Sequence, residues 1–236
     1  VGHWYGAAGI PYVHADNHGF HFIPGTSTML VGCDGGVFRT TNAGSTFTDI
    51  SGNLEIAQQY RLGVSQTNST RVITGWQDNG TNLRDGANNW SRVIGGDGFE
   101  SAIDYNNAAI MYGALYYGQI FRSTNNGGSF NTIVNSGGTG VNASGNWLTP
   151  YLIDPVTSST LYVGKSTVYK STNSGGAWTA MGSIPGGNID QLAVAKTNNN
   201  YVYCSKGATL YRTTDANTFT ALSGLPNQYI TYIAVD

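Results

Sequence analysis

One short pattern of apolar and polar positions occurs four times along the chain, at residues 37–47, 120–130, 168–178 and 210–219. Each copy reads aliphatic, aromatic, Arg or Lys, two hydroxyl residues, Asn or Asp, a turn, and a closing aromatic. The alternation in its first half predicts a strand with one buried face. The hydroxyl and Asn or Asp side chains can bond to backbone groups in the turn. The pattern therefore predicts a repeated β-hairpin.

The closing aromatics extend this repeat to five units. They are Phe47, Trp90, Phe130, Trp178 and Phe219, about 40 to 48 residues apart, which is the length of a four-stranded propeller blade. Short strand patterns between them also recur in the same order. We therefore expect an all-β fold, a β-propeller of four-stranded antiparallel blades with the closing aromatics equivalent and largely buried. The predicted blades are residues 18–51, 58–94, 99–134, 147–181 and 189–222, and 230–236 would begin a further blade.

The repeat resembles the Asp-box, S-x-D-x-G-x-T-W, of sialidase-like and sortilin-like β-propellers. Three copies carry Asn42, Asn125 and Asn173 where that family has Asp, and Asp215 alone keeps the acid. In that family the box is a folding device far from the active centre. The resemblance therefore implies a structural role for these residues.

Composition limits the classes of function. The chain has 236 residues, only 10% of them charged, and a net charge of −2. Without a basic tract nucleic acid is a poor partner, and without a long apolar run membrane insertion is not expected. The two cysteines, Cys33 and Cys204, fall on opposite strand faces of different repeats, so we expect separate thiols.

Unusual polar and aromatic residues gather in one class of loop. These loops lead into the first strand of a blade or join its second strand to its third, and a meander places them opposite the repeated turns. The candidate ligand-binding residues are His14, Asp16, His18, Trp76, Gln77, Asn79, Tyr116, Tyr117 and Trp147, and the candidate catalytic carboxylates are Asp34, Asp78 and Asp97. Aromatic rings beside carboxylates and amides suit a sugar ligand. The alternative is that the Asp-Gly and Asp-Asn-Gly sequences only form tight turns.

The first candidates form the run His14-Ala15-Asp16-Asn17-His18. On an extended strand His14, Asp16 and His18 would point the same way, as metal ligands do. No fourth ligand follows at a suitable spacing, which favours hydrogen-bonded structural histidines. We therefore predict no metal and no cofactor.

Residues 14–18, 32–44, 76–80 and 95–99 together resemble secreted sortilin-like and BNR-repeat proteins of bacteria, many with type IX secretion signals. Residues 32–39 are also similar to a segment of the two-propeller xyloglucan-cleaving glycoside hydrolases. By that resemblance Asp34 would be a catalytic carboxylate. That family takes its second catalytic Asp from its other propeller, and the arginine triad of sialidases is not evident here.

Two functions remain open. We expect a secreted or cell-surface propeller that binds a glycan or a protein, within a larger polypeptide or surface assembly, because an open stack of blades exposes its edges. The alternative is a glycoside hydrolase acting on polysaccharide, with Asp34 and either Asp78 or Asp97 as paired carboxyls. A plainer possibility is a spacer within a large surface protein.

Overall fold

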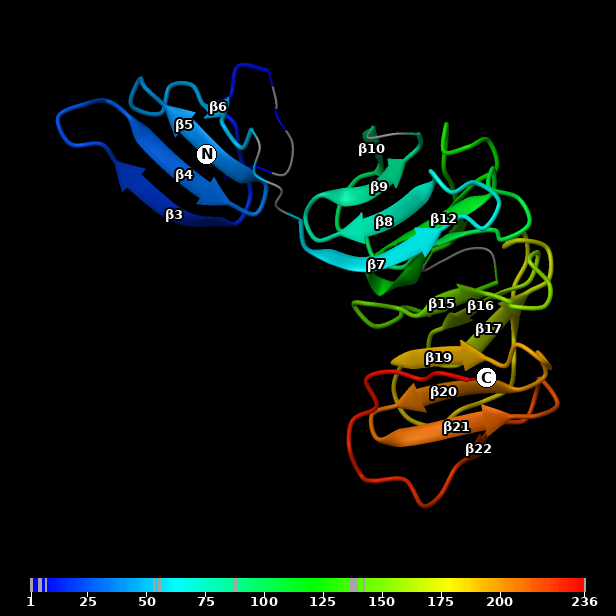
Figure 1. Ribbon diagram of the computed structural model, residues 1–236. Coiled ribbons are helices and arrows are strands. Elements are labelled where there is room, and N and C mark those ends of the chain that lie inside the picture. The colour runs from blue at the N-terminus through cyan, green and yellow to red at the C-terminus, as the bar shows by residue number, and fades with distance from the viewer. Residues whose placement is uncertain are drawn as a thin grey trace. The chain divides into compact units, whose positions relative to one another are not determined.

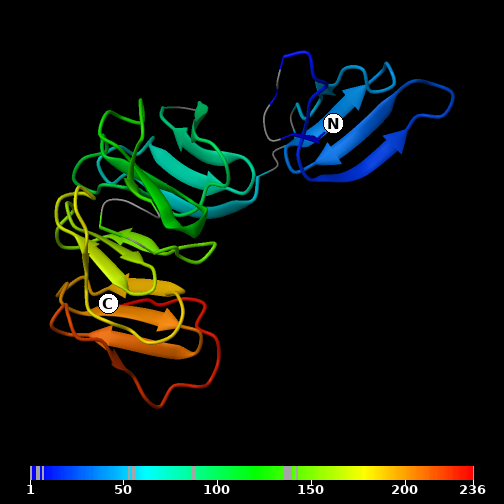
Figure 2. The same ribbon diagram turned by 180° about the vertical axis from the view of Figure 1, so that it is seen from behind.

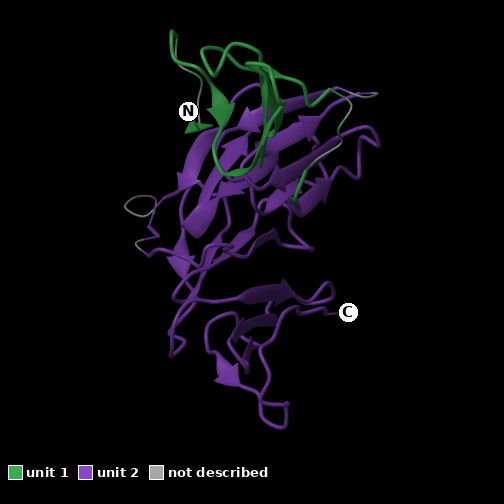
Figure 3. Cartoon of the chain, turned by 90° about the vertical axis from the view of Figure 1, so that its left-hand side faces the viewer, with its two compact units in different colours: residues 1–58 green, residues 59–236 purple. Residues whose placement is uncertain are grey.

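The computed structural model describes residues 2–3, 6, 8–52, 54, 57–86, 89–135, 140–141 and 143–235 (Figure 1). The chain divides into two compact units, unit 1 (Val1–Gln58) and unit 2 (Gln59–Asp236), coloured separately in Figure 3. The one helical element among the described residues is a three-residue 3-10 turn, η1 (Tyr116–Gly118). The predicted all-β fold is therefore confirmed.

Unit 1 contains one four-stranded antiparallel sheet and one short parallel pair. The sheet runs in sequence order through β3 (Asn17–Phe22), β4 (Met29–Cys33), β5 (Gly36–Thr40) and β6 (Thr48–Asp49). The parallel pair is β1 (Gly2–His3) with β2 (Val13–His14).

The core of unit 1 is small. Val13, Val31 and Phe38 are buried, and Tyr12 meets Phe38 edge-on at 5.9 Å between ring centroids. The first strand of the sheet has no buried face, because every residue of β3 after Asn17 is exposed.

Unit 2 contains four further four-stranded antiparallel sheets, which follow one another along the chain from cyan to orange (Figure 2). The first is β7 (Gln59–Val64), β8 (Val72–Trp76), β9 (Gly80–Arg84) and β10 (Trp90–Ile94). The second is β11 (Ser101–Ile103), β12 (Met111–Leu115), β13 (Gln119–Ser123) and β14 (Asn131–Val134). The third is β15 (Tyr151–Ile153), β16 (Leu161–Gly164), β17 (Val168–Ser171) and β18 (Thr179–Ala180). The fourth is β19 (Gln191–Val194), β20 (Val202–Lys206), β21 (Thr209–Thr213) and β22 (Thr220–Ala221).

Each sheet is a meander, so its loops fall at two opposite ends. We call the end with the repeated turn, between third and fourth strands, the turn end. The loop end carries the segment leading into the first strand and the connection from the second strand to the third. This is the arrangement the repeat predicts, with five sheets of four strands. Residues 222–235 contain no strand, so the further blade at 230–236 stays a prediction.

The repeated turn is closed by side-chain hydrogen bonds. Ser171 Oγ donates to Asn173 Oδ1 at 2.9 Å and accepts the Gly175 N–H at 2.9 Å. Asn173 Oδ1 also accepts the Ala177 N–H at 2.9 Å. The same bonds recur in the copies that begin at Thr40, Ser123 and Thr213. An amide oxygen thus accepts the same hydrogen bonds as the carboxylate of Asp215, and the predicted hairpin is confirmed.

The closing aromatics are less buried than predicted. Trp178 is buried and donates its Nε1–H to Ile133 O at 3.1 Å, across to the preceding sheet. Phe47, Phe130 and Phe219 are partly buried. Trp90 is 43% exposed, and its turn lacks the hydroxyl pair of the other copies. The prediction of uniform burial is therefore wrong at Trp90.

Polar side chains near the turn end bind neighbouring sheets of unit 2 together. Arg122 Nη1 donates to Ser174 O at 2.7 Å. Arg71 Nη1 donates to Ala108 O at 2.9 Å and to Asn126 Oδ1 at 2.7 Å. These contacts bury charged groups against carbonyl acceptors, which such groups require away from water. They are structural bonds between sheets.

The two cysteines are free thiols. Cys33 ends β4 in unit 1, and Cys204 lies in β20 in unit 2. Burial raises the pKa of the Cys204 thiol to about 12. Cys204 is thus an unreactive core residue.

Candidate functional site

Three exposed aromatic side chains meet at the loop end of unit 2. Tyr116 and Tyr117 belong to η1, between β12 and β13, and Trp147 precedes β15. Tyr116 stacks on Trp147 with ring centroids 5.4 Å apart and planes at 12°, and Tyr117 meets Trp147 edge-on at 5.5 Å. The three residues are 38%, 50% and 45% exposed. We call them the aromatic cluster, and sequence patterns predicted all three as ligand-binding residues.

Aromatic contacts link this cluster to the β8–β9 hairpin. Phe99 meets Trp147 edge-on at 5.3 Å, and Tyr60 stacks on Phe99 at 4.6 Å. The Tyr60 hydroxyl donates to Gln77 Oε1 at 3.0 Å. Gln77 and the aromatic cluster are therefore connected through Tyr60 and Phe99, and this group includes residues from the first three sheets of unit 2 and their connections.

A buried lysine supports the loop that carries Tyr117. Lys165 follows β16 and is 1% exposed. Its Nζ donates to Tyr117 O at 2.6 Å and to Gly118 O at 2.9 Å. Burial lowers the pKa of Lys165 to about 8. Since Tyr117 has a φ of +58°, the ammonium stabilises a backbone conformation that a non-glycine residue rarely adopts.

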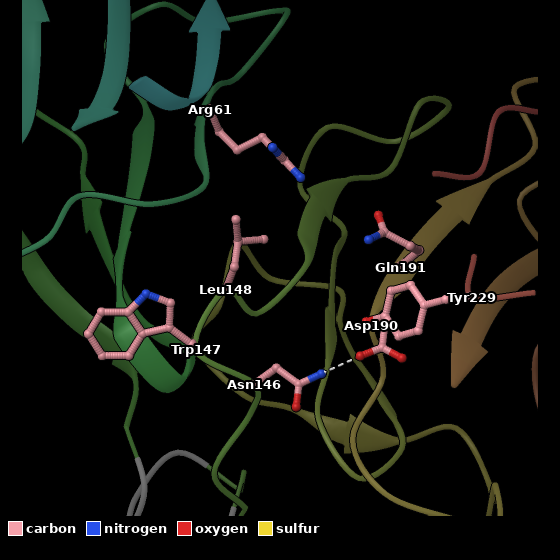
Figure 4. A pocket seen from close by; sticks show the side chains of 7 residues that line it. All are labelled: Arg61, Asn146, Trp147, Leu148, Asp190, Gln191 and Tyr229. Atoms are coloured by element: carbon pink, nitrogen blue, oxygen red, sulfur yellow. Dashed lines mark hydrogen bonds between the residues drawn. The ribbon is translucent and has the colours of Figure 1, made fainter. Parts of the chain in front are cut away.

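A cavity of about 520 Å³ lies beside Trp147 (Figure 4). Its lining residues come from β7, from the segments leading into β15 and β19, and from the chain after β22: Arg61, Asn146, Trp147, Leu148, Asp190, Gln191 and Tyr229. Asn146 Nδ2 donates to Asp190 Oδ1 at 2.6 Å, and the Gly207 N–H donates to Asp190 Oδ2 at 2.7 Å. The cavity thus combines fixed polar groups with aromatic walls.

The basic group of the cavity is Arg61, whose side chain extends into it from β7 (Figure 4). Arg61 Nη1 donates to Tyr60 O at 2.9 Å, and Arg61 Nε lies 3.3 Å from Glu100 Oε2. The Glu100 side chain is 21% exposed. Burial raises the pKa of Glu100 to about 7, although the neighbouring guanidinium opposes that rise. Glu100 is therefore a carboxyl that changes charge near neutral pH.

The β8–β9 hairpin holds most of the remaining candidates of unit 2. The Asp78 N–H donates to Asp97 Oδ1 at 3.0 Å, and Asn79 Nδ2 donates to Gln77 O at 3.1 Å. The Trp76 ring packs 5.7 Å from the Trp90 ring. These bonds involve backbone groups, which agrees with the tight-turn interpretation of this sequence.

Unit 1 holds His14, Asp16, His18 and Asp34. His14 is buried and packs against Gly35 so closely that a Cβ there would collide with its ring. His18 is exposed, and its Nε2 contacts Asp34 Oδ1. Asp16 adopts a φ of +54°, which interrupts the extended chain. His14 and His18 therefore belong to two different strands, β2 and β3, and do not lie on one continuous extended strand.

The predicted carboxyl pair is divided between the units. Asp34 belongs to unit 1, whereas Asp78 and Asp97 belong to unit 2. The use of Asp34 with either of them in catalysis stays a prediction.

Sequence patterns missed several residues of the cavity and its surroundings. Among them are Arg61, Glu100, Asp190, Gln191 and Tyr229. Two signals were available. Asp190-Gln191 precedes and begins β19 as Asn146-Trp147 precedes β15, and Arg61 is a charge within a first-strand pattern. Tyr229 had no signal, because it follows the last repeat.

No protein-family model and no curated protein matches the chain. Several solved structures are similar to the chain. An ancestral GH74 enzyme is similar with a TM-score of 0.61 at 19% identity, over 91% of this chain and 32% of that one. The GH74 xyloglucanase from Xanthomonas campestris has a TM-score of 0.54 at 15% sequence identity, and the match covers 87% of this chain and 36% of that one. The extracellular domain of a one-component system from B. thetaiotaomicron has a TM-score of 0.58 at 15% sequence identity, and the match covers 93% of this chain and 30% of that one.

These similarities show the fold. The chain has the architecture of β-propeller blades, and it spans about a third of the length of each similar structure. Among the described residues, no helix has the length and apolar character needed to span a membrane.

Proposed function

We propose that the chain is part of a secreted or cell-surface β-propeller that binds a glycan at the loop end of unit 2. The aromatic cluster and the adjoining cavity form the binding site. The observation that carries this proposal is the stacked, half-exposed pair of Tyr116 and Trp147 at the rim of a polar cavity.

The chemistry of the site fits a sugar chain. A pyranose ring has apolar C–H faces that pack on aromatic rings and hydroxyls that need directed hydrogen-bond partners. Trp147 offers an aromatic ring for the C–H face, and the amides of Asn146 and Gln191 offer hydrogen-bond partners for the hydroxyls. A volume of about 520 Å³ lies within the range of small-molecule sites, roughly 300–1,000 Å³. Exposed aromatic rings that are ordered by packing are also typical of binding surfaces.

The similar structures add support of a different kind. Two are GH74 enzymes, one of them a xyloglucanase, and the third is an extracellular domain. This fold therefore occurs both in a polysaccharide-cleaving enzyme and in an extracellular domain, and both are compatible with the proposal. The resemblance of the repeat to the Asp-box of secreted proteins points the same way.

Affinity gel electrophoresis against a panel of plant and bacterial polysaccharides, including xyloglucan, tests the proposal. We expect at least one polysaccharide to retard the protein, and Trp147→Ala to weaken that binding about tenfold, the scale of a lost aromatic stack. Tyr232→Ala is the matched control, because it removes a ring that is 75% exposed and lies outside the cluster and the cavity. Equal losses for both variants, or no retardation of the wild type, would contradict glycan binding here.

The glycoside-hydrolase alternative depends on Asp34. Its expected signature is release of reducing ends from polysaccharide by the wild type and loss of that turnover in Asp34→Asn with binding retained. Binding without turnover in the wild type would leave the binding module as the function.

A further inference from the structure

We propose that the Trp147 cavity selects glycans that carry a carboxylate, such as uronic acid residues, and that Arg61 binds this carboxylate. Glu100 is the competing internal partner of Arg61. The inference rests on the proposed glycan binding and specifies its substrate class.

Arg61 has donors to spare. A guanidinium carries five N–H groups in a planar fork that matches a carboxylate. Within the described part of the chain, the Tyr60 carbonyl takes one N–H and Glu100 faces a second. The side chain is 39% exposed and extends into the cavity (Figure 4). The remaining N–H groups are therefore available to a ligand.

The charges of the cavity are separated. Figure 4 shows Arg61 and Asp190 on different sides of the space. Both Asp190 oxygens already accept protein hydrogen bonds, one from Asn146 and one from the Gly207 N–H, and Asp190 also bonds the Tyr229 hydroxyl. An acidic ligand therefore finds its cationic partner at the Arg61 side, with its neutral hydroxyls directed toward Asn146 and Asp190. This arrangement gives the sugar one orientation.

Glu100 makes the affinity depend on pH. When Glu100 is ionised it competes with a bound carboxylate for the guanidinium, and when it is protonated the competition ends. Its pKa of about 7 places that change near neutral pH, since burial favours the protonated form. Arg61 faces the Glu100 carboxyl, while the Tyr151 hydroxyl and the Ala114 N–H both donate to the Glu100 carbonyl at 3.0 Å. Tyr151 stays neutral in this range, because burial raises its pKa.

The ligand itself keeps its charge across the same range. A uronate resembles other exposed carboxyl groups, whose pKa values are roughly 3–4. Affinity for an acidic glycan should therefore rise as the pH falls from 8.5 to 6, while affinity for a neutral glycan stays level. This difference between charged and uncharged ligands distinguishes control by Glu100 from a general change in the stability of the fold, which would affect both ligands.

The experiment uses the full chain in affinity gels that contain polygalacturonate, alginate or glucuronoxylan, each paired with its carboxyl-reduced form. Reduction converts the carboxylate to a neutral hydroxymethyl group and leaves the sugar chain in place. We expect at least one acidic polymer to bind about tenfold more tightly than its reduced partner at pH 6, the scale of one charge-assisted hydrogen-bond pair. The difference should shrink at pH 8.5.

Two variants assign the effect to residues. Arg61→Gln should abolish the preference for the acidic form and keep binding of the reduced form. Glu100→Gln should bind the acidic polymer at pH 8.5 as tightly as the wild type does at pH 6. Lys196→Gln, an exposed lysine outside the cavity, controls for the loss of one positive charge. Circular dichroism checks that each variant is folded, and the wild-type comparison of acidic and reduced polymers does not depend on any variant.

The outcomes distinguish the two proposals. If reduced and acidic polymers bind equally, or if neutral xyloglucan binds and no acidic polymer does, the carboxylate inference is wrong and glycan binding stands. If Lys196→Gln weakens acidic binding as much as Arg61→Gln, the effect is nonspecific charge attraction and the inference is also wrong. If no polysaccharide of either kind binds, the proposed function itself is wrong.

Discussion

The two ends of the sheets in unit 2 use their side chains for different purposes. At the turn end, hydroxyls such as Ser171 are buried and bond within one hairpin, and the arrangement repeats from sheet to sheet. At the loop end, Tyr116, Tyr117 and Trp147 are half exposed, and the connecting segments differ in sequence from one sheet to the next. Lys165 bonds to Tyr117 O and Gly118 O, and Lys206 bonds to Ser166 O and Ile184 O.

The difference separates folding from recognition. A turn that must form in every blade keeps the same set of side-chain hydrogen bonds, because each copy has the same backbone N–H groups to satisfy. A binding surface needs different side chains from each blade, so its loops diverge. Substitutions at the turn end should therefore change stability, and substitutions at the loop end should change ligand affinity.

The largest effect on stability is expected at Trp178. Trp178→Ala removes a ring that is 7% exposed and its bond to the preceding sheet. We expect a loss of ~3–5 kcal/mol in the free energy of unfolding, measured by chemical denaturation. Trp147→Ala, at the loop end, should cost about 1–2 kcal/mol or less, since its ring is half exposed already. Comparable losses for the two tryptophans would break the distinction between the ends.

A smaller loss is expected at Ser171. Ser171→Ala leaves the Gly175 N–H without its acceptor in a buried turn, which should cost about 1–3 kcal/mol. Ser166→Ala, at the exposed residue of the β16–β17 connection at the loop end, should change the free energy of unfolding by about 0.5 kcal/mol or less. Denaturation curves of both variants give the comparison, and an unchanged stability in Ser171→Ala would mean that the repeated turn bonds contribute little.

The smallest effect is expected at Asp215, where the other copies have Asn. The Thr218 N–H, the Thr213 hydroxyl and the Asn217 N–H hold the pKa of Asp215 well below its usual range. A depressed pKa stabilises the fold above the unfolded-state pKa of 3.8, and this contribution is lost as the pH falls through the folded-state value. The wild type should therefore be slightly more stable than Asp215→Asn at pH 7, with the difference fading below about pH 4. Thermal melts of both proteins at pH 7 and at a series of pH values below 4 test this. A difference in stability that does not change with pH would contradict the electrostatic origin.

The sequence determined the sheets because their signals are local. Alternating apolar positions, a hydroxyl two residues before Asn or Asp, and turn residues able to take a positive φ define each hairpin within about a dozen residues. The same local patterns placed Tyr116, Tyr117 and Trp147 at the loop end. They failed at Trp90, where burial depends on neighbours distant in sequence.

Only the tertiary structure decided the rest of the site. The cavity joins Arg61, Asn146, Asp190 and Tyr229 from segments that are far apart in the chain, and the repeat relates only Asn146 and Asp190 to one another. The contact between Arg61 and Glu100 likewise spans two sheets, and the charge of Glu100 depends on how much water packing removes from it. Solvent exclusion and the distances between charges are properties of the assembled fold, so sequence patterns could propose the face of the molecule but could not specify its chemistry.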